Sequence, residues 1–208
     1  MSHPFRLCYI TDRHALEPQP VVARIGEAAR AGVDLIQVRE KDLGTRDLVE
    51  LVRAALEAIR GTETRLVVND RLDVALSLGA HGVHLSVQSL PAREVRRRVP
   101  EGFLVGVSCH SLEEAQDAES ARADYIVLGP IFPTTSKIKY GPPLGLETLA
   151  SVTKQVKVPV LALGGVTPER VSKCLRAGVA GIAGISIFQS CPSTPERVRE
   201  LHRHFQHG

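Results

Sequence analysis

The segment Gln37-Val38-Arg39-Glu40-Lys41 carries two cationic side chains one residue apart. In an extended chain alternate side chains point to the same side, so Gln37, Arg39 and Lys41 would face one space. Two cations that face one space repel each other unless an anion lies between them. The pattern therefore indicates an anion-binding site. The alternative is that both cations simply pair with neighbouring acids.

Four other segments add groups that suit a phosphorylated ligand. The run Thr134-Thr135-Ser136-Lys137 offers three hydroxyls and an ammonium as hydrogen-bond donors. Gly164-Gly165 and Gly184-Ile185-Ser186 follow two late apolar runs, and glycine lets a phosphate approach backbone N–H groups. Simple tight turns are the alternative there. Asn69-Asp70 supplies one carboxylate, which could hold Mg²⁺ through waters and substrate phosphate, or cap a helix.

The elements that must position these groups can be read from the apolar pattern. Short β-branched runs recur without alternation, as in buried parallel strands. We expect strands at residues 7–11, 35–38, 66–68, 82–85, 104–107, 125–128, 160–163 and 182–185. Helical patterns lie between them, including an apolar stripe over residues 48–59. Ser111 with Glu114 has capping-box spacing, and Thr167-Pro168 and Thr194-Pro195 are typical helix starts.

Strand followed by helix, repeated about eight times in 208 residues, predicts a closed (β/α)₈ TIM barrel that forms a single domain over residues 1–208. An open doubly wound sheet is the alternative, but no G-x-G-x-x-G follows the first strand. Barrels of this kind bind ligands at the carboxyl ends of their strands. The polar segments above, together with His84, Ser108 and His110, would meet at that rim. The irregular stretch 133–144 is typical of an active-site loop.

The composition of the chain argues against nucleic-acid and membrane partners. The 26 Lys and Arg residues against 23 Asp and Glu leave a net charge of +3, which is too even for a chain that neutralises nucleic-acid backbone. No apolar run approaches the roughly 18 residues of a membrane helix. The four cysteines are far apart and form no C-x-x-C pair. We expect a cytoplasmic protein with reduced cysteines and with no nucleic-acid or membrane partner.

An ordered set of motifs resembles the thiamine phosphate synthase family. The motifs are Y-I-T-D at 9–12, I-Q-V-R-E-K at 36–41, V-N-D-R at 68–71, G-V-H-L at 82–85, G-V-S-C-H-S-L-E-E-A at 106–115, L-G-P-I-F-P-T-T-S-K at 128–137 and A-L-G-G-V at 162–166. The resemblance extends from about residue 7 to residue 188. It implies a transferase that joins 4-amino-5-hydroxymethylpyrimidine diphosphate to hydroxyethylthiazole phosphate and releases pyrophosphate.

The resemblance also implies roles for individual residues. The pyrimidine diphosphate would be held by Gln37, Arg39, Lys41, Asn69, Ser108 and Lys137. The thiazole phosphate would be held by Thr134, Ser136, Gly165, Ile185 and Ser186. Asp70 would bind Mg²⁺. Arg39, Lys41, Lys137 and Ser108 would be catalytic, because positive charge around the leaving pyrophosphate lowers the barrier to its departure. Both substrates are small molecules, and a homodimer is compatible with a small barrel.

One position departs from the family pattern. After G-V-H-L the synthases usually continue to a second metal-binding Asp, whereas this chain has Ser86-Val87-Gln88-Ser89, with Ser89 at the place of that Asp. The structural interpretation of Ser89 is a helix N-cap, two residues before Pro91. The departure puts metal affinity in question, and it leaves the synthase route open.

Two alternative functions follow from that departure. One is a thiazole tautomerase of the same superfamily, in which His84 or His110 would carry the proton, because Pro130 stands where that branch has its catalytic histidine. The other is a non-catalytic protein that binds thiamine intermediates. The presence of Arg39, Lys41, Asp70 and Lys137 favours the synthase, because a protein that binds only the thiazole would not need them.

Overall fold

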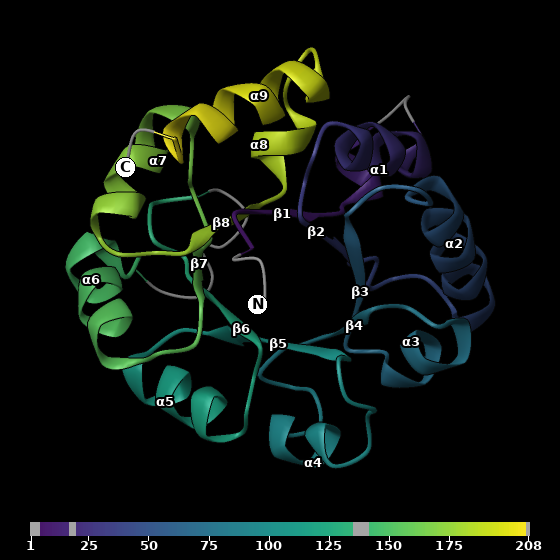
Figure 1. Ribbon diagram of the computed structural model, residues 1–208, viewed down its shortest axis with the longest axis horizontal. Coiled ribbons are helices and arrows are strands. Elements are labelled where there is room, and N and C mark those ends of the chain that lie inside the picture. The colour runs from purple at the N-terminus through teal and green to yellow at the C-terminus, as the bar shows by residue number, and fades with distance from the viewer. Residues whose placement is uncertain (1–4, 17–19, 135–141, 207–208) are drawn as a thin grey trace.

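A computed structural model describes residues 5–16, 20–134 and 142–206. Its strands are all parallel and close into a barrel in chain order, with the helices around it (Figure 1). The strands are β1 (Leu7–Ile10), β2 (Leu35–Val38), β3 (Arg65–Asn69), β4 (Gly82–Leu85), β5 (Leu104–Cys109), β6 (Tyr125–Leu128), β7 (Val160–Ala162) and β8 (Gly181–Gly184). The predicted TIM barrel and its eight strands are confirmed, with ends that differ by one or two residues.

The helices fill the connections between strands. They are the 3₁₀ helix η1 (Arg13–Leu16), α1 (Val21–Arg30), α2 (Thr45–Ala58), α3 (Leu72–Leu78), α4 (Ala92–Arg96), α5 (Leu112–Ser120), α6 (Gly145–Gln155), α7 (Pro168–Arg176), α8 (Ser186–Gln189) and α9 (Thr194–His204). The Ser111 hydroxyl accepts the backbone N–H of Glu114 at 3.2 Å, so the predicted cap of α5 is confirmed. None of these helices is long and apolar enough to cross a bilayer.

The other two predicted helix starts are only partly correct. Proline begins α7 as expected, but the Thr167 side chain makes no capping hydrogen bond. In α9 the cap is Ser193, whose hydroxyl accepts the N–H of Glu196 at 3.4 Å. Thr194 is fully buried instead, and its hydroxyl contacts Arg24 of α1. The local pattern predicts that Thr194 caps α9, but its side chain forms a tertiary contact with Arg24 instead.

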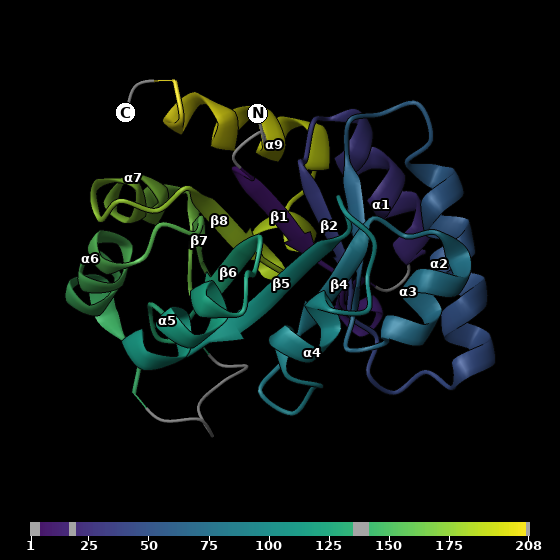
Figure 2. The same ribbon diagram turned by 60° about the horizontal axis from the view of Figure 1, so that its bottom comes forward.

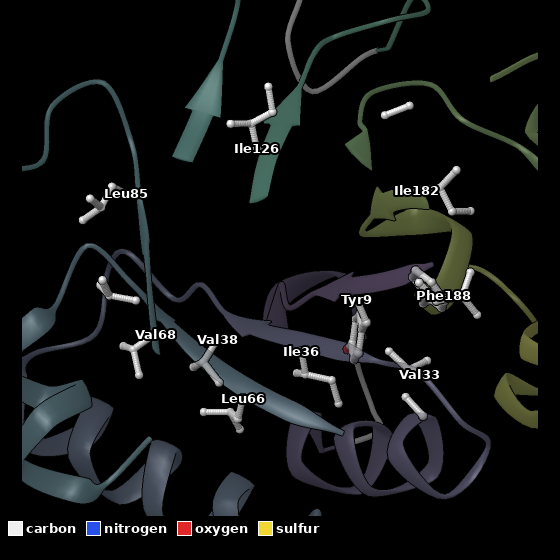
Figure 3. Close-up of a cluster of buried hydrophobic side chains, with 14 of the residues drawn as sticks. Tyr9, Val33, Ile36, Val38, Leu66, Val68, Leu85, Ile126, Ile182 and Phe188 are labelled. Atoms are coloured by element: carbon white, nitrogen blue, oxygen red, sulfur yellow. The ribbon is translucent and has the colours of Figure 1, made fainter. Parts of the chain in front are cut away.

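Alternation along the strands separates two apolar layers. Outward-facing residues pack against the helices, and Figure 3 shows Ile36, Val38, Leu66 and Val68 pointing from β2 and β3 toward them. The inward-facing layer contains Cys8, Leu35, Val67, Leu104, Tyr125, Val127, Leu161 and Ala183, with Phe5 beside them. Polar inward-facing residues appear only later along the strands, at Gln37, Asn69, His84 and Ser108. The interior is thus filled with apolar side chains near the amino ends of the strands. Near their carboxyl ends it is lined by polar side chains.

Tyr125 accounts for much of that filling. Its ring lies 5.4 Å from the ring of Phe5 and 5.6 Å from that of His84, centroid to centroid. A Cβ on Gly106 would lie 2.1 Å from Cζ of Tyr125, so only glycine leaves the ring its space. The helix α9 lies across the end at which β1 begins (Figure 2), and Arg6 lies 5.9 Å over the ring of Phe205 there. The opposite, carboxyl rim remains for a ligand.

Replacing Gly106 by alanine should therefore destabilise the barrel. We expect Gly106→Ala to lower the free energy of unfolding by about 2 kcal/mol, because overpacking a filled core forces side chains or backbone to shift. Urea unfolding would measure the change. Gly44→Ala is the control, because no heavy atom beyond its chain neighbours lies within 4 Å of the added methyl there. Gly44 is the N-cap of α2, so the smaller cost of losing glycine at a cap sets the baseline. Equal stability of the two variants would contradict the interpretation.

Candidate active site

The polar residues at the carboxyl rim form a directed chain of hydrogen bonds. Nε2 of Gln37 donates to Oδ1 of Asn69 at 2.8 Å, and Nδ2 of Asn69 donates to Oδ2 of Asp70 at 2.7 Å. An ionised carboxylate only accepts, so the Asn69 amide must turn its NH₂ to Asp70 and its oxygen to Gln37. This leaves Oε1 of Gln37 buried with no partner among the described residues. The chain therefore presents one buried acceptor to a donor from a ligand.

Asp70 is held by a backbone and by donors that favour its charge. Its φ of 59° is left-handed, a conformation that aspartate tolerates better than most residues. Oδ1 accepts the N–H of Ser86 at 2.9 Å and the hydroxyl of Ser89. Partial burial opposes ionisation, but these hydrogen bonds and the charge of Lys41 outweigh it and lower the pKa of Asp70. Asp70 is thus an ionised carboxylate at neutral pH.

The predicted N-cap role of Ser89 is wrong. The N-cap position of α4 is Pro91, which offers no side-chain cap. The Ser89 hydroxyl instead donates to Asp70 and accepts the backbone N–H of Ser86 at 2.7 Å. A hydrogen bond from the Ser89 hydroxyl to the ionised carboxylate of Asp70 is stronger than a hydrogen bond between neutral groups. The hydroxyl is therefore oriented toward Asp70 rather than toward the start of α4.

His84 joins Ser108 to the barrel interior. Its Nε2 lies 2.9 Å from the Ser108 hydroxyl and its Nδ1 lies 3.1 Å from the Tyr125 hydroxyl. Burial lowers the pKa of His84 to about 4; the Asp70 carboxylate opposes this shift, and the charge of Arg39 adds to it. A neutral imidazole has one donor and one acceptor, and both nitrogens are engaged here. His84 is therefore suited to hold Ser108 rather than to carry a proton near pH 7.

His110 has a different environment. Its Nδ1 contacts the carbonyl oxygen of Gly129, and its backbone N–H donates to Glu114 at 2.6 Å. A carbonyl only accepts, so Nδ1 carries a proton in this contact. Of the two histidines considered from the sequence, only His110 has a ring nitrogen that is not engaged by a described residue.

Arg39 and Lys41 are not paired with the neighbouring acids. Neither side chain forms an ion pair or a hydrogen bond with any described residue, whereas Glu40 and Asp42 both bind Arg13. The charge of Lys41 acts on Asp70 and that of Arg39 on His84, so both cations act on the groups at the barrel mouth. The alternative that these cations pair with neighbouring acids is wrong. The alternation predicted for this segment places the acids on the other side.

The glycine turns lie across the rim, after β7 and β8. Gly164 and Gly165 have φ values of 92° and 63°, and a Cβ on Gly165 would lie 2.6 Å from the carbonyl oxygen of Pro133. Arg170 fixes this turn, because it donates to the Gly165 carbonyl at 2.6 Å and stacks 4.7 Å over the ring of Phe132. The turn requires glycine for its own backbone, as the alternative interpretation held.

The same turns also present donors. The backbone N–H groups of Gly165 and Ser186 bind no described residue. Ser186 is exposed at the start of α8, and Ile185 directly before it is half-buried. Thr134, in the connection after β6, is also half-buried. Ser136, Lys137 and residues 135–141 as a whole lie outside the described residues, so the predicted active-site loop is not described beyond its ends.

One part of the rim was not predicted from the sequence. Thr11, Arg13 and Glu40 form a network that joins the ends of β1 and β2. The Thr11 hydroxyl also accepts the backbone N–H of Arg39 at 2.9 Å. The signal was present in the alternation of Arg39-Glu40-Lys41, which places Glu40 opposite the cations and toward the neighbouring strand.

The match to known families decides the classification. The family model described as thiamine monophosphate synthase matches residues 7–188. This chain belongs to the thiamine monophosphate synthase family. The expected family is therefore confirmed, and with it the expected class of enzyme, a transferase of the thiamine phosphate synthase type.

Relatives of this family match over nearly the whole chain. A thiamine-phosphate synthase of Roseiflexus sp. (strain RS-1) is 41% identical over 193 residues, which is 93% of this chain and 82% of that protein. The structure of a thiamine phosphate pyrophosphorylase from Pyrococcus furiosus superposes with a TM-score of 0.87 at 34% identity, covering 99% of this chain and 97% of that one. A 3-hexulose-6-phosphate synthase, at 18% identity and a TM-score of 0.68, shares the fold alone.

Burial of neutral His84 should make stability depend on pH. The unfolded imidazole takes up its proton near pH 6.5 and the folded one only near pH 4. Between these values the unfolded chain binds more protons, so stability falls as the pH falls, by up to about 3 kcal/mol from this group. Urea unfolding of the native chain and of His84→Gln across pH 4–7 would measure it. The variant should lose this part of the pH dependence, and parallel curves would contradict the assignment.

Proposed function

We propose that this chain couples 4-amino-5-hydroxymethylpyrimidine diphosphate to hydroxyethylthiazole phosphate, giving thiamine phosphate and pyrophosphate. The observation that carries the proposal is that Arg39 and Lys41 form no ion pair with a described residue, while the charge of Lys41 acts on Asp70 and that of Arg39 acts on His84. Two unneutralised cations beside an ionised carboxylate suit a metal diphosphate. Membership of the family supports this substrate class.

In this reaction no side chain of the protein forms a covalent bond with a substrate. The bond from the benzylic-type carbon to the diphosphate oxygen breaks, and the thiazole nitrogen forms the new bond to that carbon. Arg39, Lys41 and Lys137 would surround the departing oxygens with positive charge, which lowers the barrier. Ser108, held by His84, would bind the same diphosphate. Holding the two rings within reach supplies much of the remaining rate.

The hydrogen-bond chain supports the placement of the pyrimidine. Oε1 of Gln37 is a buried acceptor, and an exocyclic amino group is a donor that would satisfy it. Asn69 sets this polarity by facing Asp70 with its NH₂ group. We propose Gln37 and Asn69 as ligands of the pyrimidine diphosphate on this basis.

The donor set around Asp70 fits Mg²⁺ as the resident metal. The carboxylate is ionised, and the hydroxyl of Ser89 and the amide of Asn69 lie against it. No three His, Cys, Asp or Glu side chains gather as a metal site among the described residues. Mg²⁺ often binds through one carboxylate, waters and substrate phosphates. Asp70 would hold the ion with the diphosphate, and the ion would add positive charge on the leaving oxygens.

The opposite side of the rim suits the thiazole phosphate. The N–H groups of Gly165 and Ser186, which bind no described residue, are donors for phosphate oxygens, with Ile185 between β8 and α8. Thr134 follows Pro133, whose carbonyl oxygen lies against the Gly165 turn, and Ser136 would complete this set of ligands. The proposal treats residues 1–208 as one barrel domain that acts on small molecules. Cytoplasmic location and a homodimer stay predictions.

A coupling assay with both substrates and Mg²⁺ tests the proposed function. Formation of thiamine phosphate with pyrophosphate release is the expected result. Conversion of the thiazole isomer alone would instead assign the tautomerase reaction, with His110 as the histidine to test. Binding of the substrates without turnover would identify a binding protein. Either of these two results would overturn the synthase proposal.

Removing one rim cation should slow the reaction. We expect Arg39→Ala, and likewise Lys137→Ala, to lower kcat/KM by more than about tenfold, because each removes roughly 1.4 kcal/mol or more of charge stabilisation in the transition state. Steady-state kinetics of pyrophosphate release would measure this. Arg53→Ala is the control, because Arg53 is an exposed cation on α2 that pairs with Glu50. Rates close to that control would remove Arg39 and Lys137 from the mechanism.

Placing a second carboxylate beside Asp70 should strengthen metal binding. We expect Ser89→Asp to tighten Mg²⁺ binding about tenfold, because a second carboxylate would replace a hydroxyl that donates to Asp70. Titration calorimetry with Mg²⁺ in the presence of pyrophosphate would measure it. Ser151→Asp adds the same charge on the exposed face of α6 and serves as the control. An unchanged affinity in Ser89→Asp would show that Ser89 does not face the metal.

A further inference from the structure

Arg13 binds both acids that alternate with the rim cations. Its guanidinium contacts Oε2 of Glu40 at 3.2 Å and Oδ1 of Asp42 at 2.6 Å, with a second nitrogen on Oδ2 of Asp42. Its backbone N–H adds bonds of 3.1 and 3.2 Å to the two oxygens of Glu40. Glu40 is almost fully buried, with 2% of its side chain exposed. A single residue, the first of η1, thus engages both carboxylates of the Arg39–Asp42 segment.

These two acids adjoin the cations of the proposed phosphate site in the chain, and without a counter-charge they would reduce its positive charge. Glu40 and Asp42 each adjoin Lys41 in the chain, and Glu40 also adjoins Arg39. An unneutralised carboxylate within a screening length of about 8 Å offsets part of the charge of a cation, even when the two side chains point to opposite sides of the segment. Hydrogen bonds from Arg13 and then His14 hold the pKa of Asp42 well below its usual range, so Asp42 is charged at neutral pH. Arg13 supplies a counter-charge to both acids.

Arg13 also acts on the position of Arg39 through the buried acid. The Glu40 carboxylate that Arg13 holds accepts the Thr11 hydroxyl at 2.6 Å. That hydroxyl accepts the backbone N–H of Arg39 at 2.9 Å. The path from Arg13 to Arg39 is thus a continuous set of hydrogen bonds between the ends of β1 and β2. Charge and geometry favour the same outcome.

We propose that Arg13 is a positioning residue that keeps Arg39 and Lys41 available for a diphosphate by binding Glu40 and Asp42. Arg13 itself would not contact the ligand, because its guanidinium is engaged by the two carboxylates. The inference rests on the proposed function, since it takes Arg39 and Lys41 as the cations that bind the diphosphate.

The test measures the affinity for inorganic pyrophosphate with Mg²⁺ by titration calorimetry. We expect Arg13→Gln to weaken binding about tenfold, because two carboxylates beside the cations lose their counter-charge. The double variant Arg13→Gln/Asp42→Asn should recover affinity to within about threefold of the native chain, because the exposed acid is then removed. A merely structural role of Arg13 would not be rescued by removing Asp42. Circular dichroism would verify the fold of each variant.

Arg13→Lys keeps the measurement informative if Arg13→Gln fails to fold. Lysine retains a cation but cannot bridge two carboxylates as a guanidinium does, so an affinity about threefold below native is expected. Native affinity in this variant would overturn the inference. So would an Arg13→Gln variant that binds pyrophosphate normally, or one that Asp42→Asn does not rescue.

Arg39→Ala separates failure of the inference from failure of the proposed function. If Arg39→Ala loses pyrophosphate binding while Arg13→Gln does not, the diphosphate site stands and the role of Arg13 is wrong. If Arg39→Ala binds pyrophosphate like the native chain, the proposed site is wrong, and the inference falls with it.

Discussion

Alternation of side chains along parallel strands of a closed barrel is the constraint on which the site depends. Because successive residues face opposite sides of the barrel wall, β2 directs Ile36 and Val38 to the helices and Gln37 to the interior. The same alternation continues past the strand end into Arg39-Glu40-Lys41-Asp42. It separates cations from acids that are adjacent in sequence. In a helix, by contrast, residues two positions apart do not share a face.

Charge at the rim is arranged before any ligand arrives. Asp70 is ionised because Ser89, Ser86 and Lys41 outweigh its partial burial, and its charge then orients Asn69 and Gln37. The acids Glu40 and Asp42 are engaged by Arg13, and Arg39 and Lys41 form no ion pair with a described residue. Preorganised charge of this kind stabilises a developing anion without reorganisation during the reaction, which is what the departure of pyrophosphate requires.

The departure at Ser89 fits into this arrangement. A serine beside Asp70 satisfies the carboxylate with a hydroxyl in place of a second metal-binding acid. Membership of the thiamine monophosphate synthase family is compatible with this change, because the family model matches residues 7–188, which include this position. His84, a candidate proton carrier from the sequence, is instead a buried neutral support for Ser108.

The sequence by itself determined the barrel, its strands and the rim positions of Gln37, Arg39, Asn69, Asp70 and Ser108, because apolar runs and strand ends are local properties. The cap at Ser111 is equally local. Only the tertiary structure decided that Ser89 faces Asp70, that Thr194 turns to Arg24, and that Arg13 binds Glu40. In each case a charged group far away in the chain competes with the local partner, and a closed barrel sets which distant groups come within reach.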